Sequence, residues 1–387
     1  MSSVNFLEKL LGGVSVEWMP LSYFSSVLRG KRLTKSQLSE NADFPVYHGG
    51  LDPLGYYTEF NRPANTVMII NVGASAGTVG YSFSKFWSSD GCYCLKHNSL
   101  INNRYLYFSL IGFQDFLRSR VRVAGIPTLD AKVINSIKIP IPCPDNPKKS
   151  LEIQAEIVRI LDAMTAHTAE LTAELTARKK QYDYYRDKLL SFEEGEVEWK
   201  ELGDVAEYSK TRISFEYIDK SNYVGVDNLL QNRQGKTESN YVPASGNLLE
   251  YRKDDILIGN IRPYLKKIWY SDRIGGTNGD VLVIRLKDEK LNARYLYQIL
   301  ADDKFFEYNM QHAKGAKMPR GSKDKILKYL IPIPLLVEQA RIVAILDKFD
   351  ALTSSLTEGL PREIELRQKQ YAYYRDLLLS FPAAQAV

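Results

Sequence analysis

The apolar positions divide the chain into two kinds of stretch. Between Val16 and Pro142, short runs of β-branched, aromatic and other apolar residues alternate with turn-forming residues, which is typical of β-strands. One helix is predicted at 103–116, and the second half of the chain shows the same layout up to about residue 335. We therefore expect two α+β domains of one kind. The runs that predict strands include 44–47, 67–72, 91–95 and 256–258.

Two longer stretches follow a helical period instead. From about Leu151 to Phe192, and again from residue 336, apolar side chains recur at alternating steps of four and three residues, as in a coiled-coil seam. An amphipathic helix packed on a globular domain shows a similar stripe. Because the two seams match, we expect the helices to pack on each other as a spacer. The seam positions that we assign to the spacer are Ile157, Leu161, Leu171, Leu175, Tyr182, Tyr185, Ile342, Leu346, Tyr371 and Tyr374.

The two halves of the chain repeat the same motifs in the same order. Ile-Pro-Ile-Pro occurs at 139–142 and again at 331–334. The run Lys-Gln-Tyr-x-Tyr-Tyr-Arg-Asp occurs at 180–187 and again at 369–376. A period of about half the chain indicates a duplication rather than a solenoid.

The order of the repeats is circularly permuted. Residues 7–11 (Leu-Glu-Lys-Leu-Leu) resemble residues 186–190 (Arg-Asp-Lys-Leu-Leu), so the chain begins inside a repeat unit. We predict an α+β fold with two similar α/β domains, separated by two long antiparallel coiled-coil helices and related by a pseudo-two-fold axis. The expected parts are 1–150 for the first domain, 151–194 for the central helix, 195–335 for the second domain and 336–387 for the C-terminal helix.

Two features make the long helices unequal. The first contains a tandem Thr-Ala-Glu-Leu at 168–175, and the second has four more residues between its repeated motifs. Four extra residues shift a heptad as a stutter, so the apolar face continues. The second helix also contains Gly359-Leu360-Pro361. Because Pro361 lacks an N–H and clashes with the preceding turn, we expect a kink or a new helix there.

The composition indicates how charge is distributed along the chain and in which compartment the protein is expected. Within a net charge of +5, Lys and Arg outnumber Asp and Glu in both predicted α/β domains, while the central helix is acidic. A basic domain attracts a polyanion, although ordinary scatter produces excesses of this size. No apolar stretch of about 18 residues predicts a membrane span, and no signal peptide is read. The cysteines form no even framework, which fits a reducing cytoplasm and argues against a zinc site.

The sequence contains no recognisable catalytic motif. Glu198-Trp199-Lys200, with Asp204 nearby, has the form of a nuclease motif, but the other copy reads Glu17-Trp18-Met19 and lacks the lysine. No Gly-Lys-Ser/Thr follows the small residues 73–77, which therefore favour a tight turn over a phosphate cradle. The Asn/Asp-Pro-Pro-aromatic signature of amino-methyltransferases is missing, and the histidines have no metal-ligand spacing. We predict neither a catalytic nor a metal site.

The loops between the repeated anchors carry residue types that suit DNA. Residues 260–267 and 314–323 are rich in Asn, Arg and Lys, and the first half has 71–77 and 123–128 in their place. Arg can bind guanine edges and Asn adenine edges with two hydrogen bonds, whereas Lys and glycine-flanked amides suit phosphates. A solvated loop is the alternative at each position. The candidate DNA contacts are Asn71, Ser75, Arg122, Thr128, Asn260, Arg262, Tyr264, Lys266, Lys317 and Arg320.

The duplicated motifs resemble those of a known family. Ile-Pro-Ile-Pro, Ile-Val-x-Ile-Leu-Asp and Lys-Gln-Tyr-x-Tyr-Tyr-Arg-Asp are similar to motifs of the specificity subunits of type I restriction-modification systems. The tandem Thr-Ala-Glu-Leu resembles their type IC branch. The resemblance covers essentially the whole chain in layout and is most specific in the two long helices. It is weakest in the two α/β domains, where such proteins are expected to diverge.

The resemblance implies a non-catalytic DNA-recognition subunit. Each α/β domain would be a target-recognition domain that reads one half of a split DNA site. Each half would also dock a methyltransferase subunit, for which the seam positions assigned above to the spacer are the candidate residues. The expected partners are double-stranded DNA, two DNA-methyltransferase subunits and ATP-driven restriction subunits. S-adenosylmethionine, ATP and Mg would belong to those subunits, with no cofactor in this chain. The alternatives are a stand-alone nuclease or methyltransferase and a coiled-coil protein without nucleic acid.

Overall fold

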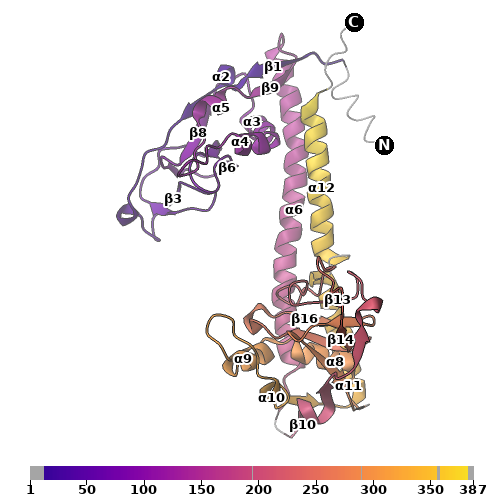
Figure 1. The fold of residues 1–387 in the computed structure, drawn as a ribbon. Coiled ribbons are helices and arrows are strands. Elements are labelled where there is room, and N and C mark those ends of the chain that lie inside the picture. Colours follow the sequence, from indigo (N-terminus) through magenta and orange to yellow (C-terminus); the bar gives the residue numbers. More distant parts are fainter. Residues whose placement is uncertain (1–12, 194, 289, 355–357, 382–387) are drawn as a thin grey trace. The chain divides into compact units, whose positions relative to one another are not determined.

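The computed structural model describes residues 13–193, 195–288, 290–354 and 358–381, coloured along the chain in Figure 1. The chain divides into two compact units. Unit 1 spans Met1–Ala169 and Leu366–Val387, and unit 2 spans Glu170–Glu365. Unit 1 therefore combines the first part of the chain with part of its last helix. The repeated motif at 7–11 lies outside the described residues.

Unit 1 contains a two-stranded ribbon and two sheets. All neighbours in the larger sheet are antiparallel, and its strand β5 is buried at every position. The strands predicted at 44–47, 67–72 and 91–95 are β3, β5 and β8. The strands are β1 (Val16–Pro20) and β9 (Lys138–Pro142) in the ribbon, β2 (Ser25–Leu28), β8 (Cys92–His97), β5 (Thr66–Ile70) and β6 (Val79–Ser82) across the larger sheet, and β4 (Gly55–Tyr57), β3 (Phe44–Tyr47) and β7 (Trp87–Ser88) across the smaller sheet.

The helices of unit 1 pack against the larger sheet. They are α2 (Leu21–Phe24), α3 (Asn103–Gly112), α4 (Gln114–Ser119) and α5 (Ala131–Asn135). The single helix predicted at 103–116 is wrong in extent, because the chain turns at Phe113. There the N–H of Phe113 donates to the carbonyl of Leu110 at 3.0 Å, and a new helix starts. Gly112 precedes this turn, and glycine weakens a helix interior.

Unit 2 repeats unit 1 with the elements in the same order. Its ribbon and larger sheet correspond to those of unit 1, and each smaller sheet contains one parallel pair. The strand predicted at 256–258 is β15. The elements are β10 (Glu198–Glu201) and β19 (Leu330–Ile333) in the ribbon, β11 (Ala206–Tyr208), β18 (Val281–Leu286), β15 (Ile256–Gly259) and β16 (Ile268–Tyr270) in the larger sheet, β12 (Arg212–Ser214), β14 (Asn247–Tyr251), β17 (Gly275–Thr277) and β13 (Tyr223–Val224) in the smaller sheet, and helices α7 (Leu202–Val205), α8 (Ala293–Leu300), α9 (Asp303–Gln311) and α10 (Lys323–Ile326).

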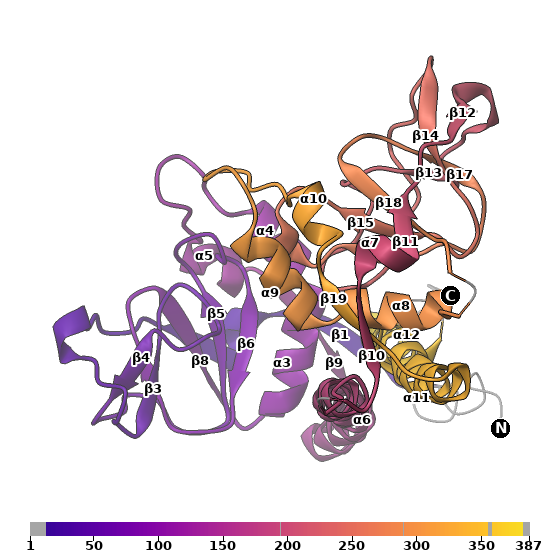
Figure 2. The ribbon, with the colours of Figure 1, turned by 90° about the horizontal axis from the view of Figure 1, so that it is seen from below.

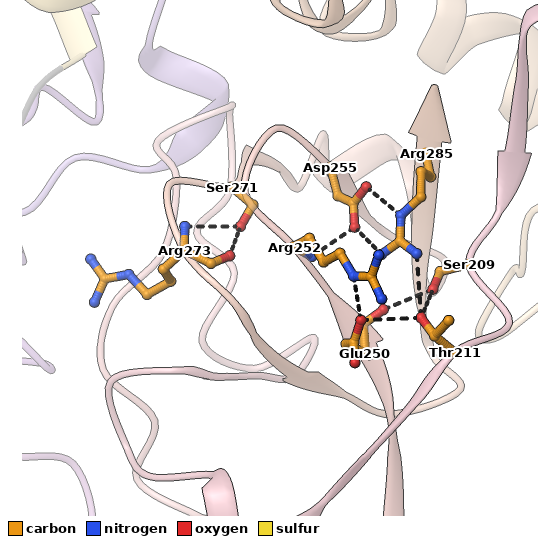
Figure 3. Close-up of polar contacts among 8 residues, drawn as sticks. All are labelled: Ser209, Thr211, Glu250, Arg252, Asp255, Ser271, Arg273 and Arg285. Carbon is orange, nitrogen blue, oxygen red and sulfur yellow. Dashed lines mark hydrogen bonds and ion pairs between the residues drawn. The ribbon is translucent and has the colours of Figure 1, made fainter. Parts of the chain in front are cut away.

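A polar cluster connects the two sheets of unit 2 (Figure 3). Arg285 of β18 donates to both carboxylate oxygens of the buried Asp255, at 3.0 and 2.6 Å, and to the hydroxyl of Thr211 at 3.3 Å. The hydroxyl of Ser209 donates to the carbonyl of Glu250, in β14 of the smaller sheet, at 2.8 Å. The hydrogen bond with Asp255 raises the pKa of Arg285. Because these polar groups satisfy one another, the cluster fixes one sheet on the other rather than presenting a site.

The long helical segments contribute to the cores of both units. The segments are α6 (Pro147–Leu189), α11 (Leu336–Ser354) and α12 (Gly359–Ser380). In unit 1, Ile157 and Leu161 of α6 share a core with Leu378 of α12. In unit 2, Tyr182 of α6 shares a core with Leu346 of α11. The start of α6 thus meets the end of the second helical segment, and its end meets the start, so the two run antiparallel as predicted.

The predicted break at Gly359-Leu360-Pro361 is confirmed. Helix α11 ends at Ser354, and α12 begins at Gly359 with Pro361 in its first turn, where a missing N–H costs no helical hydrogen bond. Gly359 has φ +73°, and a Cβ there would lie 2.4 Å from the carbonyl oxygen of Ala351. Only glycine fits this junction. No helix among the described residues is long and apolar enough to cross a membrane.

Candidate nucleic-acid interface

The same small hairpin follows the third helix of each α/β fold. In hairpin 1 (residues 122–128), Arg122 and Thr128 exchange two backbone hydrogen bonds, of 2.9 and 3.0 Å. In hairpin 2 (residues 314–320), Lys314 and Arg320 do the same at 2.9 and 2.8 Å. The duplication has therefore preserved the closure of the hairpin, while the residues in between differ.

Each hairpin is fastened to the loop that follows the central strand of the larger sheet. In unit 1 this is loop 1 (residues 71–77), where the N–H of Gly73 donates to the carbonyl of Pro127 at 2.9 Å. In unit 2 it is loop 2 (residues 260–267), where the N–H of Arg262 donates to the carbonyl of Pro319 at 2.7 Å. Loop and hairpin thus form one surface in each unit, from residues far apart in sequence.

Two predicted contact residues, Asn71 and Asn260, lie beneath these surfaces. Their exposed fractions are 3% and 6%, and their carbonyls accept hydrogen bonds from the N–H groups of Leu129 and Gly321. The side-chain amide of Asn71 also donates to the carbonyl of Asp90 at 3.3 Å. No described residue donates to the Oδ1 of Asn71 or of Asn260. These two asparagines therefore connect loop and hairpin in this conformation, and a base contact would require them to move.

Among the predicted contacts of unit 2, two exposed cations have no ion pair within the described residues, and Lys314 of hairpin 2 is a further exposed cation. Arg262 and Lys317 are exposed, and neither side chain has a hydrogen-bond or ion-pair partner among the described residues. Arg262 has φ +53°, a left-handed conformation that is uncommon for arginine and that aims loop 2 toward hairpin 2. Tyr264 is exposed beside it. These three side chains are available to a ligand.

Two further predicted cations of unit 2 already have partners. Arg320 forms an ion pair with Asp280 at 2.7 Å, and Lys266 forms one with Asp303 at 2.8 Å. Burial lowers the pKa of Lys266, and the nearby guanidinium of Arg233, which also contacts Asp303, adds to this effect. Arg320 and Lys266 can reach a phosphate only in exchange for these carboxylates.

The surface of unit 1 is less charged. Arg122 is exposed, whereas Ser75 and Thr128 are half-buried, and the hydroxyl of Thr128 donates to the carbonyl of Ile126 at 2.8 Å. In loop 1, Gly77 has φ +87°, and a Cβ there would lie 2.9 Å from the backbone nitrogen of Arg118. Loop 1 therefore packs tightly on α4, where loop 2 extends a basic chain instead.

The sequence interpretation missed two features: an exposed apolar residue in each hairpin, and a contact between an arginine and an aspartate in each unit. Ile126 in hairpin 1 and Met318 in hairpin 2 are strongly exposed apolar side chains, each directly before the proline of its hairpin. The sequence shows that they are equivalent, because an apolar residue precedes a proline in both hairpins. It does not show that their side chains are exposed. The second omission is a contact between an arginine and an aspartate in each half of the chain. The arginines stand in a repeated Asn-x-Arg-Tyr-Leu-Tyr, at 102–107 and 292–297, and the aspartates end a repeated Ile-Leu-Asp, at 160–162 and 345–347.

An arginine on the second helix of each unit, α3 or α8, contacts the adjacent long helix. In unit 1, Arg104 donates to Asp162 of α6 at 2.8 Å and lies over four aromatic rings, 4.5 to 5.0 Å from their centroids. In unit 2, Arg294 contacts Asp347 at 2.9 Å and Asp350 at 3.2 Å, where α8 lies along α11 (Figure 2). Burial raises the pKa of Asp350, although Arg294 opposes the shift. These pairs fix each α/β fold on its helix.

The predicted spacer residues fall into three groups of exposure. Within unit 1, Ile157 and Leu161 are fully buried and Tyr371 packs against the same core; within unit 2, Tyr182, Ile342 and Leu346 are buried. Tyr185 is 37% exposed, and its ring stacks on that of Phe349 at 5.6 Å between ring centroids. The residues that remain half-buried are Leu171, Leu175 and Tyr374.

In the nuclease-like motif, the lysine lies near two carboxylates. Lys200 lies 3.4 Å from Glu198 and 4.0 Å from Asp288, and the indole of Trp199 is exposed on the ribbon, as is that of Trp18. Within the described ranges, no three His, Cys, Asp or Glu side chains gather as a metal site would require.

The chain contains two copies of one α/β fold, each with its own loop and hairpin as a candidate contact surface. The chain belongs to the type I restriction-modification DNA specificity family, whose domain model matches residues 15–178 and 194–366. The predicted family is thereby confirmed. A nuclease or methyltransferase that acts alone finds no support in the match.

Named relatives agree with this assignment over all or most of their length. The chain is 37% identical to the EcoR124I/EcoR124II specificity subunit of Escherichia coli, covering 100% of both chains. It is 30% identical to the EcoprrI specificity subunit of Escherichia coli, covering 92% of this chain and 93% of that one. The crystal structure of a type I restriction-modification S subunit from M. genitalium shares the fold, with a TM-score of 0.63, 16% identity and coverage of 97% and 98%.

Proposed function

We propose that each α/β domain, 1–150 and 195–335, reads one half of a bipartite DNA site through its loop and hairpin. The observation that carries this proposal is the pair of matched surfaces: two hairpins with identical backbone closure and different side chains. A conserved frame with variable tips allows two different short sequences to be read by one fold. The helical parts, 151–194 and 336–387, would serve as the spacer between the two readers.

Individual residues take different roles in this proposal. The exposed side chains Arg262, Tyr264, Lys317 and Arg122 would contact bases and phosphates directly. Asn71, Asn260, Ser75 and Thr128 would position the loops, since they are buried or half-buried. Lys266 and Arg320 would join only if DNA displaced their carboxylate partners.

The chain would act through partner subunits rather than by its own chemistry. We infer that each half docks one DNA-methyltransferase subunit, in the region where the α/β fold meets its helix, and that restriction subunits join the assembly. S-adenosylmethionine, ATP and Mg would then be bound by those partners, which would carry out methylation and cleavage. Because the proposed ligand is DNA, the complex would work in the cytoplasm.

The proposal is tested by mapping methylated adenines in DNA modified by the complex of this chain with its methyltransferase. The unaltered complex should methylate a two-part motif with a fixed gap. Arg262→Gln should relax the sequence requirement in one part only, costing about 1–3 kcal/mol of discrimination there. Lys253→Gln is the matched control, because Lys253 is exposed at the other end of β15, away from loop 2. A motif that changes in both parts, or in neither, would contradict the assignment.

A further inference from the structure

The tips of the two hairpins expose an apolar side chain at the same place. Ile126 is 69% exposed and Met318 is 50% exposed. Each directly precedes a proline, Pro127 or Pro319, whose carbonyl accepts a hydrogen bond from the neighbouring loop, at 2.9 and 2.7 Å. The apolar side chain therefore occupies an equivalent position in both copies of the fold, even though the surrounding residues differ.

Both tips are held by backbone hydrogen bonds on three sides. Each hairpin is closed by its own pair of bonds, fastened to its loop through the proline carbonyl, and tied to the end of the central strand by the residue that follows. Glycines with positive φ, Gly125 at +86° and Gly315 at +98°, complete the turns. A side chain presented on such a fixed backbone loses little freedom when it enters a binding site.

The surroundings of the two side chains indicate which ligand they would meet. Single exposed apolar residues are common on protein surfaces, so exposure alone carries little weight. Here, however, neither loop and neither hairpin contains an Asp or Glu, and exposed cations stand close by: Arg122 beside Ile126, and Lys317 and Arg262 around Met318. An apolar side chain among cations matches duplex DNA, where stacked bases lie between rows of phosphates.

We propose that Ile126 and Met318 enter between adjacent base pairs, one in each half-site, and partly unstack them. Isoleucine and methionine are among the side chains that act as such wedges, and the opened step bends the duplex. The inference rests on the proposed function and goes beyond it, because it assigns specificity to steps that receive no hydrogen bond. Flexible pyrimidine–purine steps open most readily, so each half-site should contain one at the wedge.

The test uses the complex of the full chain with its methyltransferase and a duplex carrying the mapped site. 2-Aminopurine replaces one base at a time across each half-site, apart from the adenine that becomes methylated. With the unaltered complex, fluorescence should rise several-fold at one step in each half. Ile126→Ser should abolish the rise in the first half-site only, and Met318→Ser in the second only. Each variant should also lower the preference for the flexible step about tenfold.

Matched control variants distinguish the loss of a wedge from the loss of any exposed apolar side chain. Leu54→Ser, directly before β4 in unit 1, and Ile274→Ser, directly before β17 in unit 2, remove exposed apolar side chains next to the smaller sheets and outside both loops and hairpins, and should leave both signals unchanged. Specific binding without any fluorescence rise, or a rise that survives both hairpin variants, overturns the wedge and leaves the proposed function standing. Loss of the methyltransferase from the Ser variants overturns it too, because the side chains would then dock protein. If the unaltered complex recognises no sequence at all, the proposed function itself fails.

Discussion

The loop and hairpin of unit 1 and those of unit 2 share a backbone arrangement and differ in charge. Both consist of a loop after the central strand and a hairpin held to it by equivalent hydrogen bonds. Unit 2 places Arg262 and Lys317 on this frame, whereas unit 1 places one exposed cation, Arg122, beside small and apolar residues. Backbone hydrogen bonds hold the hairpin to its loop in both units, so the side chains at the tips can differ without changing the backbone arrangement.

The largest effect is expected where the two units are fixed on their helices. Arg294→Ala would remove the guanidinium that pairs with two carboxylates, Asp347 and Asp350, and should cost unit 2 about 2–4 kcal/mol. Arg104→Ala leaves only Asp162, which is more exposed, and should cost unit 1 less. Urea unfolding followed by hydrogen exchange in peptides of each unit would measure both losses. An equal loss in the two units would show that the second carboxylate contributes nothing.

The cost of Arg294→Ala should also depend on pH. Burial raises the pKa of Asp350 in the folded chain, and removing Arg294 removes a group that opposes this shift. A carboxyl whose folded pKa is raised contributes stability at low pH, and this contribution is lost as the pH rises through the folded pKa. The variant should therefore be closer to the unaltered chain at about pH 5 than at about pH 7.5. Unfolding curves at the two pH values would decide, and a pH-independent difference would refute the idea.

The charge difference between the surfaces predicts a different dependence on salt. Each phosphate contact that is lost lowers the slope of log affinity against log salt by about one. The double variant Arg262→Gln, Lys317→Gln should therefore lower the slope by about two, and Arg122→Gln by about one. Titrations of the assembled complex at several salt concentrations would measure the slopes, with Lys253→Gln expected to change nothing. If the slopes fell equally for the variants of the two units, the predicted difference in their phosphate contacts would be wrong.

A smaller effect is expected at the buried asparagines. Asn71 donates a side-chain hydrogen bond to the carbonyl of Asp90, whereas the side chain of Asn260 has no hydrogen-bond partner among the described residues. Asn71→Ala should therefore cost about 1 kcal/mol, and Asn260→Ala should cost less. Thermal unfolding of the two variants would compare them. A larger loss for Asn260→Ala would mean that its amide has a partner in solution, such as bound water.

The smallest effect on the half-sites is expected from a change within α6. A third Thr-Ala-Glu-Leu inserted after Leu175 would lengthen this helix by about 6 Å, which corresponds to between one and two base pairs at about 3.4 Å each. Both surfaces stay unaltered, so the gap in the methylated motif should widen while its two parts remain the same. Methylation mapping would show this, and altered parts with an unchanged gap would speak against a spacer.

The periodicity of apolar residues allowed much of the fold to be predicted. The candidate site was harder to predict, because the burial of its side chains depends on contacts between distant parts of the chain. The seams, the strands at 44–47 and 256–258, and the break at Pro361 depend on local patterns, so the sequence reveals them. The helix at 103–116 was drawn too long, because the turn at Phe113 depends on how α4 packs. Asn71 was chosen for its amide, but its burial comes from a hairpin about fifty residues further along the chain.

The ion pairs show the same limit for charge. Lys266 was predicted as a free cation. Its partner Asp303 begins α9, and the sequence around Lys266 does not indicate that this helix lies beside it. The pairs Arg104–Asp162 and Arg294–Asp347 could have been found, because all four residues stand in motifs that the chain repeats. Repetition of both partners at matching positions is a signal that a single motif lacks.

The core of unit 1 includes Leu378, Leu379 and Phe381 from the far end of the described chain. During synthesis, the core of unit 1 therefore stays incomplete until residues 378–381 have been made, whereas the residues of unit 2 are all present once Glu365 has been added. Chains cut short before Leu378 should release an intact unit 2 and a unit 1 that proteases attack.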